Sequence, residues 1–506
     1  MSSRHPYARL AATRRKLSAC IAAVVAAGAS VLAHGQVPMA APTMPGAQSI
    51  AQLSWKMALP RPAAKRSPAT LSADAVVVSS CADDGGFDTL RHAVLVAGSG
   101  ATIDMSGLAC SKITLGSAIV IGQNDLTLAG PGAGKLAIDG GQAGRVFQHV
   151  GYGTLTVNDL TVTHGLITGD QALGGCIYTK SDVTLNRSVV TSCTAVGQTL
   201  AAGGGVVALG NLLARSSEIS DNLASAQIGA DANLSAAGGG AFAVYQTSLI
   251  GSVVSGNAAQ TATGVAFAGG AMGQALKVKY STISENDAAS VGDTTNLGGG
   301  GGLVGGADTT ILSSTIDNNS SDVAGALFLL ESYPLTVSIM QSTISSNTGR
   351  LGFGAISATP AMSISNSTIA FNVSGPLANI AVVFNDVATI ESSIIAGNGP
   401  ADVYGPAISG SHNLINTIAP GTILPMDTKS EDPKLQPLAY NGGPTRTHAL
   451  GIGSPAIGAG TNTGNYPNDE RGPTFKRVVG GTADIGAFER DADHIFGTTH
   501  EYPLID

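Results

Sequence analysis

The feature of this 506-residue sequence that most constrains its fold is a short motif, Ser-x-Ile/Val-x-x-Asn, that recurs along the chain. One copy lies in GSVVSGN at residues 251–257, and it ends at an asparagine as every other copy does. Successive asparagines are separated by 25 to 35 residues, and they are Asn222, Asn257, Asn286, Asn319, Asn347, Asn372 and Asn398. A drifting period of this size predicts a solenoid whose loops vary in length.

The pattern inside each unit selects the kind of solenoid. Apolar residues alternate with small polar ones, as in Ser363–Ile369, which is the period of a β-strand, and no unit carries a ten-residue helical stripe. The units are also too short for propeller blades, which need four strands in about 40 residues. Each unit therefore predicts one coil of a parallel β-helix with two or three short strands, an all-β fold.

The motif itself has a structural interpretation. Inward-facing Ile, Val and Leu would form a continuous core, and glycine clusters such as Gly203–Val206 would permit tight corners. Asparagine tolerates a left-handed backbone and can bond the equivalent asparagine of the next coil. We therefore interpret the seven asparagines as a structural ladder rather than a ligand site.

The N-terminal segment predicts export. Five basic residues, Arg4, Arg9, Arg14, Arg15 and Lys16, precede an Ala/Val-rich run that is shorter than the ~20 residues of a membrane-spanning helix. Residues 1–33 are therefore expected to be a signal peptide, followed by a Pro/Ala-rich linker at 34–75. Removal of the signal peptide leaves 21 basic residues against 34 acidic ones, and it leaves no stable membrane span. Such an acidic chain is a poor candidate for binding nucleic acid or anionic lipid, and we expect neither as a partner.

Cysteine usage agrees with export. Cys20 leaves with the signal peptide, and an even number remains: Cys81, Cys110, Cys176 and Cys193. Two disulfides are expected, and local pairing suggests Cys81 with Cys110 and Cys176 with Cys193, although other connectivities stay open. Neither the cysteines nor the dispersed histidines have the spacing of a metal site.

The chain then divides into further segments. Residues 76–165 contain short apolar runs that predict a cap and the first coils, and residues 166–410 are the repeat β-helix. One stretch, Phe87–Val96, has Phe87, Leu90 and Val94 at helical spacing. A short amphipathic helix here would cover the first exposed coil.

The C-terminal region, residues 411–490, resembles the choice-of-anchor Q domain found in secreted bacterial right-handed parallel β-helix proteins of the pectate-lyase-like superfold. The resemblance is carried by Asp432–Leu438, Asn441–Thr445, Gly453–Ile457, Asp469–Gly472 and Asp484–Glu489. Gly458 departs from the family, which usually has Asp there. The resemblance implies a right-handed helix with a small C-terminal domain and an extracellular or cell-surface location. Residues 491–506 form a tail without an evident anchor motif, so release into the periplasm or medium is an equal expectation.

Candidate catalytic groups are few. A Ca²⁺-dependent lyase needs several carboxylates on one strand face and a basic residue beside the substrate, and the coils contain no dense acidic motif. Asp317 and Asp386 are the best candidates, near coil corners, and Ca²⁺ is implied only if the chain is a lyase. Arg471, Asp484 and Glu489 are expected to form a buried clamp that fixes the C-terminal region against the last coil.

Three functions are consistent with this pattern. The first is adhesion or carbohydrate binding, without catalysis, by a monomeric rod that recognises an extracellular polysaccharide or a host or cell-surface glycan. Its recognition surface would be the variable loops Ala195–Ala202, Ala224–Ala237, Ala258–Ala268 and Ala288–Leu297. The second is a lyase or hydrolase acting on an acidic polysaccharide, and the third is a structural spacer.

Overall fold

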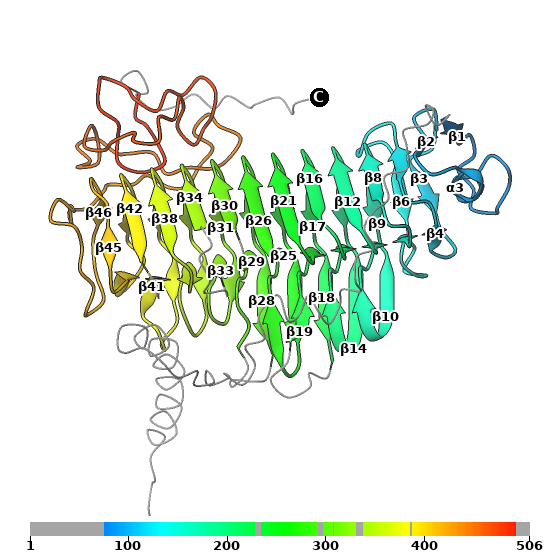
Figure 1. Cartoon of the computed structure of the whole chain (residues 1–506), viewed down its shortest axis with the longest axis horizontal. Helices are drawn as coiled ribbons and strands as arrows, with labels where there is room; N and C mark the ends of the chain where they lie inside the picture. The colour runs from blue at the N-terminus through cyan, green and yellow to red at the C-terminus, as the bar shows by residue number, and fades with distance from the viewer. Residues whose placement is uncertain are drawn as a thin grey trace, which may run out of the picture.

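The computed structural model describes residues 75–227, 234–291, 297–306, 308–329, 337–384 and 387–491. The predicted signal peptide, most of the linker, almost all of the tail and the candidate Asp386 lie outside these ranges. The described chain is an elongated rod of parallel strands, with α3 at one end and β45 and β46 at the other (Figure 1).

Three parallel sheets surround the core, and we name them A, B and C. Each coil contributes one strand to sheet C, then one to A, then one to B, and the next coil repeats the order. Sheet A consists of β1 (Val76–Val77), β2 (Ala101–Asp104), β5 (Leu126–Ala129), β8 (Thr154–Asn158), β12 (Asp182–Asn186), β16 (Leu212–Arg215), β21 (Gln246–Ile250), β26 (Ala275–Lys279), β30 (Thr309–Leu312), β34 (Val337–Met340), β38 (Met362–Ser365), β42 (Ala388–Glu391) and β45 (Ile408–Ser409).

The other two sheets have the same connectivity. Sheet B consists of β3 (Lys112–Thr114), β6 (Ala137–Asp139), β9 (Thr161–Thr163), β13 (Val189–Thr191), β17 (Glu218–Ser220), β22 (Val253–Ser255), β27 (Thr282–Ser284), β31 (Thr315–Asp317), β35 (Thr343–Ser345), β39 (Thr368–Ala370), β43 (Ile394–Ala396) and β46 (Leu414–Ile415). Sheet C consists of β4 (Ile119–Ile121), β7 (Phe147–His149), β11 (Ile177–Thr179), β15 (Val206–Ala208), β20 (Ala241–Ala243), β25 (Ala271–Gly273), β29 (Leu303–Gly305), β33 (Leu327–Leu329), β37 (Ile356–Ala358), β41 (Ile380–Phe384) and β44 (Ala401–Tyr404). The predicted fold class, an all-β parallel β-helix, is therefore confirmed.

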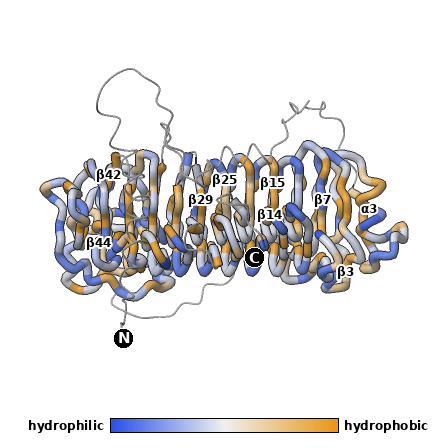
Figure 2. The backbone as a smooth tube through the Cα atoms, turned by 90° about the horizontal axis from the view of Figure 1, so that it is seen from below, coloured by the Kyte–Doolittle hydropathy of each residue, from blue (hydrophilic) through white to orange (hydrophobic). Residues whose placement is uncertain are grey.

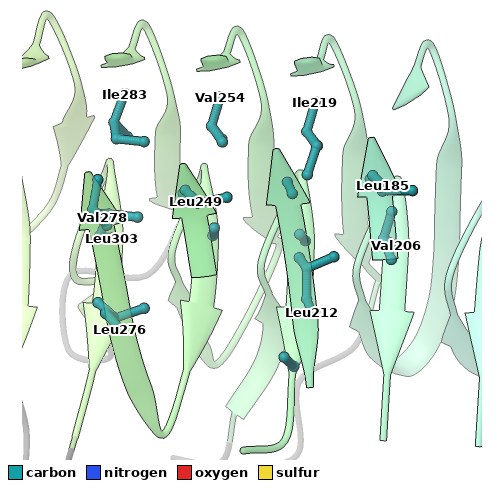
Figure 3. Close-up of a cluster of buried hydrophobic side chains, with 14 of the residues drawn as sticks. Leu185, Val206, Leu212, Ile219, Leu249, Val254, Leu276, Val278, Ile283 and Leu303 are labelled. Atoms are coloured by element: carbon teal, nitrogen blue, oxygen red, sulfur yellow. The ribbon is translucent and has the colours of Figure 1, made fainter. Parts of the chain in front are cut away.

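Alternation within each strand builds the core. In sheet B, the middle residue of each strand points inward and pairs in register with the same kind of residue in the next coil, as in Ile219, Val254 and Ile283. Figure 3 shows these side chains beside Leu212, Leu249 and Leu276 of sheet A, inside the rod. Hydrophobic segments recur in this way along the whole rod (Figure 2).

A fourth sheet, D, was not predicted. It consists of β10 (Leu166–Leu173), β14 (Thr194–Ala202), β18 (Leu223–Ala226), β19 (Leu234–Ala237), β23 (Ala258–Thr261), β24 (Val265–Phe267), β28 (Asp287–Ser290), β32 (Ser320–Ser321), β36 (Thr348–Gly349) and β40 (Val373–Ser374). Strand β14 pairs with β18 through its first half and with β19 through its last two residues, so the sheet branches there.

Sheet D corrects the interpretation of the variable loops. All four predicted loops contribute strands to it, and the segments 228–233 and 292–296 within them lie outside the described residues. The end of β14 packs with β19 and β24 on the outward face of sheet C. These strands enclose a second apolar core that includes Val207, Phe242, Met272 and Phe267. Small residues such as Ala201 and Ala237 make this close layer possible because they occupy little volume.

The N-terminal cap is shorter than predicted. Helix α3 spans Leu90–Val96, and the Thr89 side chain caps it by accepting a hydrogen bond from the backbone N–H of His92. Leu90 and Val94 are buried as expected, but Phe87 precedes the helix and its side chain is 89% exposed. Among the described residues, no helix is long and apolar enough to span a membrane.

The C-terminal region does not simply close the last coil. It turns back and covers the outward face of sheet B from β31 to β46, as the orange and red segment of Figure 1 shows. Thr315, Ser345 and Thr368 bond residues of this region although they lie in successive coils. The region was expected to be fixed against the last coil, and it packs on several successive coils.

Candidate functional site

The seven asparagines form one buried column. The side-chain amide nitrogen of each donates to the side-chain oxygen of the next over 2.8 to 2.9 Å, and Asn398 donates to Asp402 at the end of the column. The left-handed residue is the one that precedes each asparagine, such as Asp221 or Glu285, and not the asparagine itself. All these amides are used within the fold, so the column is structural.

A second column lies beside the first. The hydroxyl of the motif's serine accepts a hydrogen bond from the backbone N–H of the equivalent serine one coil earlier, over 3.0 to 3.2 Å. The column consists of Ser188, Ser217, Ser252, Ser281, Ser314, Ser342, Ser367 and Ser393. The recurring serine of the sequence motif was the available signal for this column.

Both expected disulfides are present. Cys176 and Cys193 are buried in the core. The backbone N–H of Cys193 donates to the side chain of Asn222, so Cys193 stands in the preceding coil where the other coils have the ladder asparagine. Cys81 and Cys110 join the cap to the first coil and are half-buried. These bridges are structural because each lies within the packed end or core of the rod.

Asp317 lies beneath the C-terminal region. It follows Ile316 at the end of β31, and its carboxylate accepts hydrogen bonds from Arg446 and Asn318. The side chain is fully buried, and burial raises the pKa of Asp317 to about 6 against the opposing effect of Arg446. A group covered in this way cannot touch a polymer, so Asp317 is unsuited to the catalytic role considered for it while the region is docked.

A second carboxyl occupies the same interface. Glu470 is fully buried and receives hydrogen bonds from the hydroxyls of Thr343, Thr315 and Thr445. Burial raises the pKa of Glu470 well above its ordinary value. Glu470 lies in Asp469–Gly472, one of the stretches that carry the family resemblance, but its contacts could not be predicted, because Thr315 and Thr343 lie 155 and 127 residues away.

The predicted clamp is present with different partners. Arg471 pairs with Asp469 at 2.7 Å and lies between the rings of Phe475 and Phe488. Glu489 pairs instead with Arg477 at 3.0 Å, and burial raises the pKa of Glu489 to about 7.

Asp484, the third predicted member, is also turned away from Arg471. It accepts backbone hydrogen bonds from Gly458 and Arg490. Every one of these contacts lies inside the C-terminal region. The three predicted residues therefore stabilise that region internally and do not attach it to a coil.

The outward face of sheet A has the most regular exposed chemistry. One residue from each of twelve successive strands pairs in register in a single row: Thr102, Thr127, Thr156, Thr184, Leu213, Ser248, Lys277, Thr310, Ser338, Ser363, Thr389 and Ser409. We call this set the hydroxyl row, because every member except Leu213 and Lys277 carries a hydroxyl group. All are exposed or half-buried apart from Ser248. Neighbouring members are about 4.8 Å apart, as the pairing of parallel strands requires.

Cations gather in the middle of that face. Lys277 and Lys279 both point outward from β26, and Arg215 lies in register with Ile250 and Lys279. Tyr280, which follows Lys279 at the corner, is 44% exposed. We call Arg215, Lys277, Lys279 and Tyr280 the basic patch.

Other parts of the molecule are less suited to binding. A pocket of about 270 Å³ between the last coils and the C-terminal region is lined by Phe371, Gly397, Asn416 and Lys434. The Asn416 amide already donates to the backbone carbonyls of Ser430 and Glu431, so that group is used within the fold. Across the described ranges, no three His, Cys, Asp or Glu side chains converge as a metal site would require.

Comparison with known proteins adds little to this geometry. No model of a protein family matches the chain, and no curated protein matches it. A search of solved structures finds the crystal structure of pectate lyase Pel9A, with a TM-score of 0.43 and 14% sequence identity over 83% of this chain and 98% of that one. The resemblance to choice-of-anchor Q domains therefore stays a prediction.

Proposed function

We propose that the protein is an exported glycan-binding rod and that sheet A is its binding face. The observation that carries this proposal is the hydroxyl row, an in-register array from Thr102 to Ser409 with a hydroxyl at ten of its twelve positions and only Ser248 buried. Hydroxyl side chains both donate and accept hydrogen bonds, as sugar hydroxyls do. Their constant spacing would allow an extended polymer to form the same contact at successive coils.

Binding by sheet A replaces binding by loops. The segments predicted to recognise ligand are built into sheet D, where many of their alanines pack against other residues and are closed to solvent. The flat face of sheet A has no such cover over Ser363, Thr389 or Ser409. A rigid scaffold holds a binding array in place better than mobile loops do.

Export and surface display are part of the proposal. Two disulfides support an oxidising compartment, since such bonds persist outside the cytosol. Mass spectrometry of protein recovered from the culture medium and the cell surface tests export, with cleavage after Ala33 as the expected result. Recovery of the intact chain only from the cytosol would contradict this part of the proposal.

A blocking experiment tests the binding face. Ser363→Cys places a thiol on sheet A, and Val253→Cys places one on the exposed part of sheet B. After attachment of a polyethylene glycol maleimide, binding to a panel of neutral and acidic polysaccharides should fall at least tenfold for the first variant only. Equal binding by both labelled variants would reject sheet A as the site.

Product formation from uronate polymers, detected by ultraviolet absorbance, would favour the lyase alternative, and no binding at all would favour the spacer.

A further inference from the structure

We propose that the basic patch on sheet A recognises the anionic groups of an acidic glycan. This inference rests on the proposed function, because the patch lies within the proposed binding face. It adds a chemical class of ligand and names the residues that select it: Arg215, Lys277 and Lys279 for charge, and Tyr280 for the sugar ring.

The three cations of the basic patch, Arg215, Lys277 and Lys279, form no ion pair within the part of the chain that the structure describes. Elsewhere in the coils, Arg187 pairs with Asp159 at 2.6 Å, and Arg350 bonds Asp287 and Asp322. Carboxylates of the fold thus neutralise Arg187 and Arg350, whereas the basic patch keeps its charge within the described residues.

The clustering of these like charges lowers the stability of the fold. Lys277 and Lys279 are two residues apart on one strand face, so their Cα atoms are separated by roughly 6.6 Å, and Arg215 is two strands away at about 10 Å. Like charges at such distances repel one another and destabilise the fold slightly. The chain as a whole carries a net charge of −8, so a cationic cluster is not a consequence of its composition. A ligand with negative groups would relieve the repulsion.

The surroundings of the basic patch suit a sugar polymer. Lys277 is itself a member of the hydroxyl row, between Ser248 and Thr310 in the neighbouring coils. Tyr280 lies beside Gly251, the equivalent corner of the preceding coil, where no side chain competes for space. An exposed aromatic ring next to hydroxyls and cations offers a stacking surface, hydrogen bonds and charge to one sugar polymer.

Dextrans test the inference, because one backbone is obtainable in neutral, carboxymethylated and sulfated forms. The folded, exported chain should bind at least one charged dextran at least tenfold more tightly than neutral dextran, and 0.5 M salt should weaken that binding because it screens charge. Lys277→Gln with Lys279→Gln should lower affinity for the charged polymer at least tenfold. The matched control, Lys135→Gln with Lys476→Gln, changes two exposed lysines outside sheet A and should bind as the wild type does. Tyr280→Ala should weaken binding severalfold while leaving its salt dependence unchanged.

The outcomes separate this inference from the proposed function. Equal affinity for neutral and charged dextran would overturn the inference while supporting glycan binding by sheet A. Equal losses in the test and control variants would also overturn it, because charge alone and not its position would then matter. Polyglutamate carries charge without sugar, and if it bound as tightly as the charged dextrans the ligand would not be a glycan. Failure of every dextran to bind would overturn the inference, and the wider polysaccharide panel would then decide the proposed function.

Discussion

The guanidinium group of Arg446 bonds the carboxylate of Asp317 across the boundary between the C-terminal region and sheet B, although 129 residues separate them in sequence. Asp317 is the only candidate catalytic residue within the described ranges, and this contact holds the C-terminal region over it. It also defines an interface whose buried carboxyl groups should respond to pH.

The first prediction concerns that response. Burial raises the pKa of Asp317 to about 6 from 3.8, and it also raises the pKa of Glu470. The folded protein therefore binds these protons more tightly than the unfolded chain, and its free energy of unfolding falls as pH rises from about 4 to about 6 and beyond. Glu470→Gln removes the charge from this buried position, and it should raise Tm at pH 8 with little effect at pH 4.

Thermal unfolding at the two pH values checks this prediction, with the exposed Glu431→Gln as a control. If the variant and the wild type had the same Tm at pH 8, ionisation of Glu470 would not destabilise the folded protein, and the prediction would be wrong.

The second prediction concerns the asparagine ladder. Asn319 donates to Asn347 and to the carbonyl of Ile283, and it accepts hydrogen bonds from Asn286. Asn319→Ala leaves these buried groups without partners, at about 1 to 3 kcal/mol for each. Urea unfolding should show a loss of several kcal/mol, whereas Ser363→Ala on the exposed face should change stability by less than about 0.5 kcal/mol. Similar small losses in both variants would contradict a structural role for the column.

The third prediction separates the two disulfides. The Cys176–Cys193 bridge is buried in the core, and the Cys81–Cys110 bridge is half-buried in the cap. Thiolate attack needs access to a sulfur atom, so graded reduction followed by alkylation should label Cys81 and Cys110 first. Mass spectrometry of the peptides measures the order, and earlier labelling of Cys176 would show that the core opens before the cap.

The fourth prediction concerns the interior of the C-terminal region. Arg477 is fully buried and donates to Glu489 and to the carbonyls of Gly486 and Asp484. Arg477→Met leaves a buried carboxyl without its cation and should destabilise the region by about 3 to 5 kcal/mol. Limited proteolysis should then release fragments from residues 411–490 while the coils stay resistant. The double variant Arg477→Met with Glu489→Gln should recover part of the loss, and no recovery would mean that the pair is not energetically coupled.

The sequence predicted the parts of the fold that repeat. Residues equivalent to Asn257 and Val254 return every 25 to 35 residues because every coil needs the same corner and the same inward side chain, so the repeat reveals both the core and the ladder. The two disulfides followed from local spacing in the same way.

Other features had no periodic signal. The Ala-rich strand β14 looked like a loop, because alanine has little strand preference and its burial depends on Val207 and Phe242 in other strands. Glu470 meets Thr315 only after the chain has turned back along the rod. The basic patch was also hidden, since Arg215 and Lys279 become neighbours only through the register of three strands.

Lysine footprinting tests the central claim, that sheet A is the binding face, most directly. The protein is treated briefly with an acylating reagent in the absence and presence of a saturating charged dextran, and modification at each lysine is measured by mass spectrometry. If sheet A is the binding face, the polymer slows modification of Lys277 and Lys279 severalfold and leaves modification of Lys135 and Lys476 unchanged. Saturating polymer that protects Lys135 and Lys476 instead, or protects all four equally, would contradict that claim.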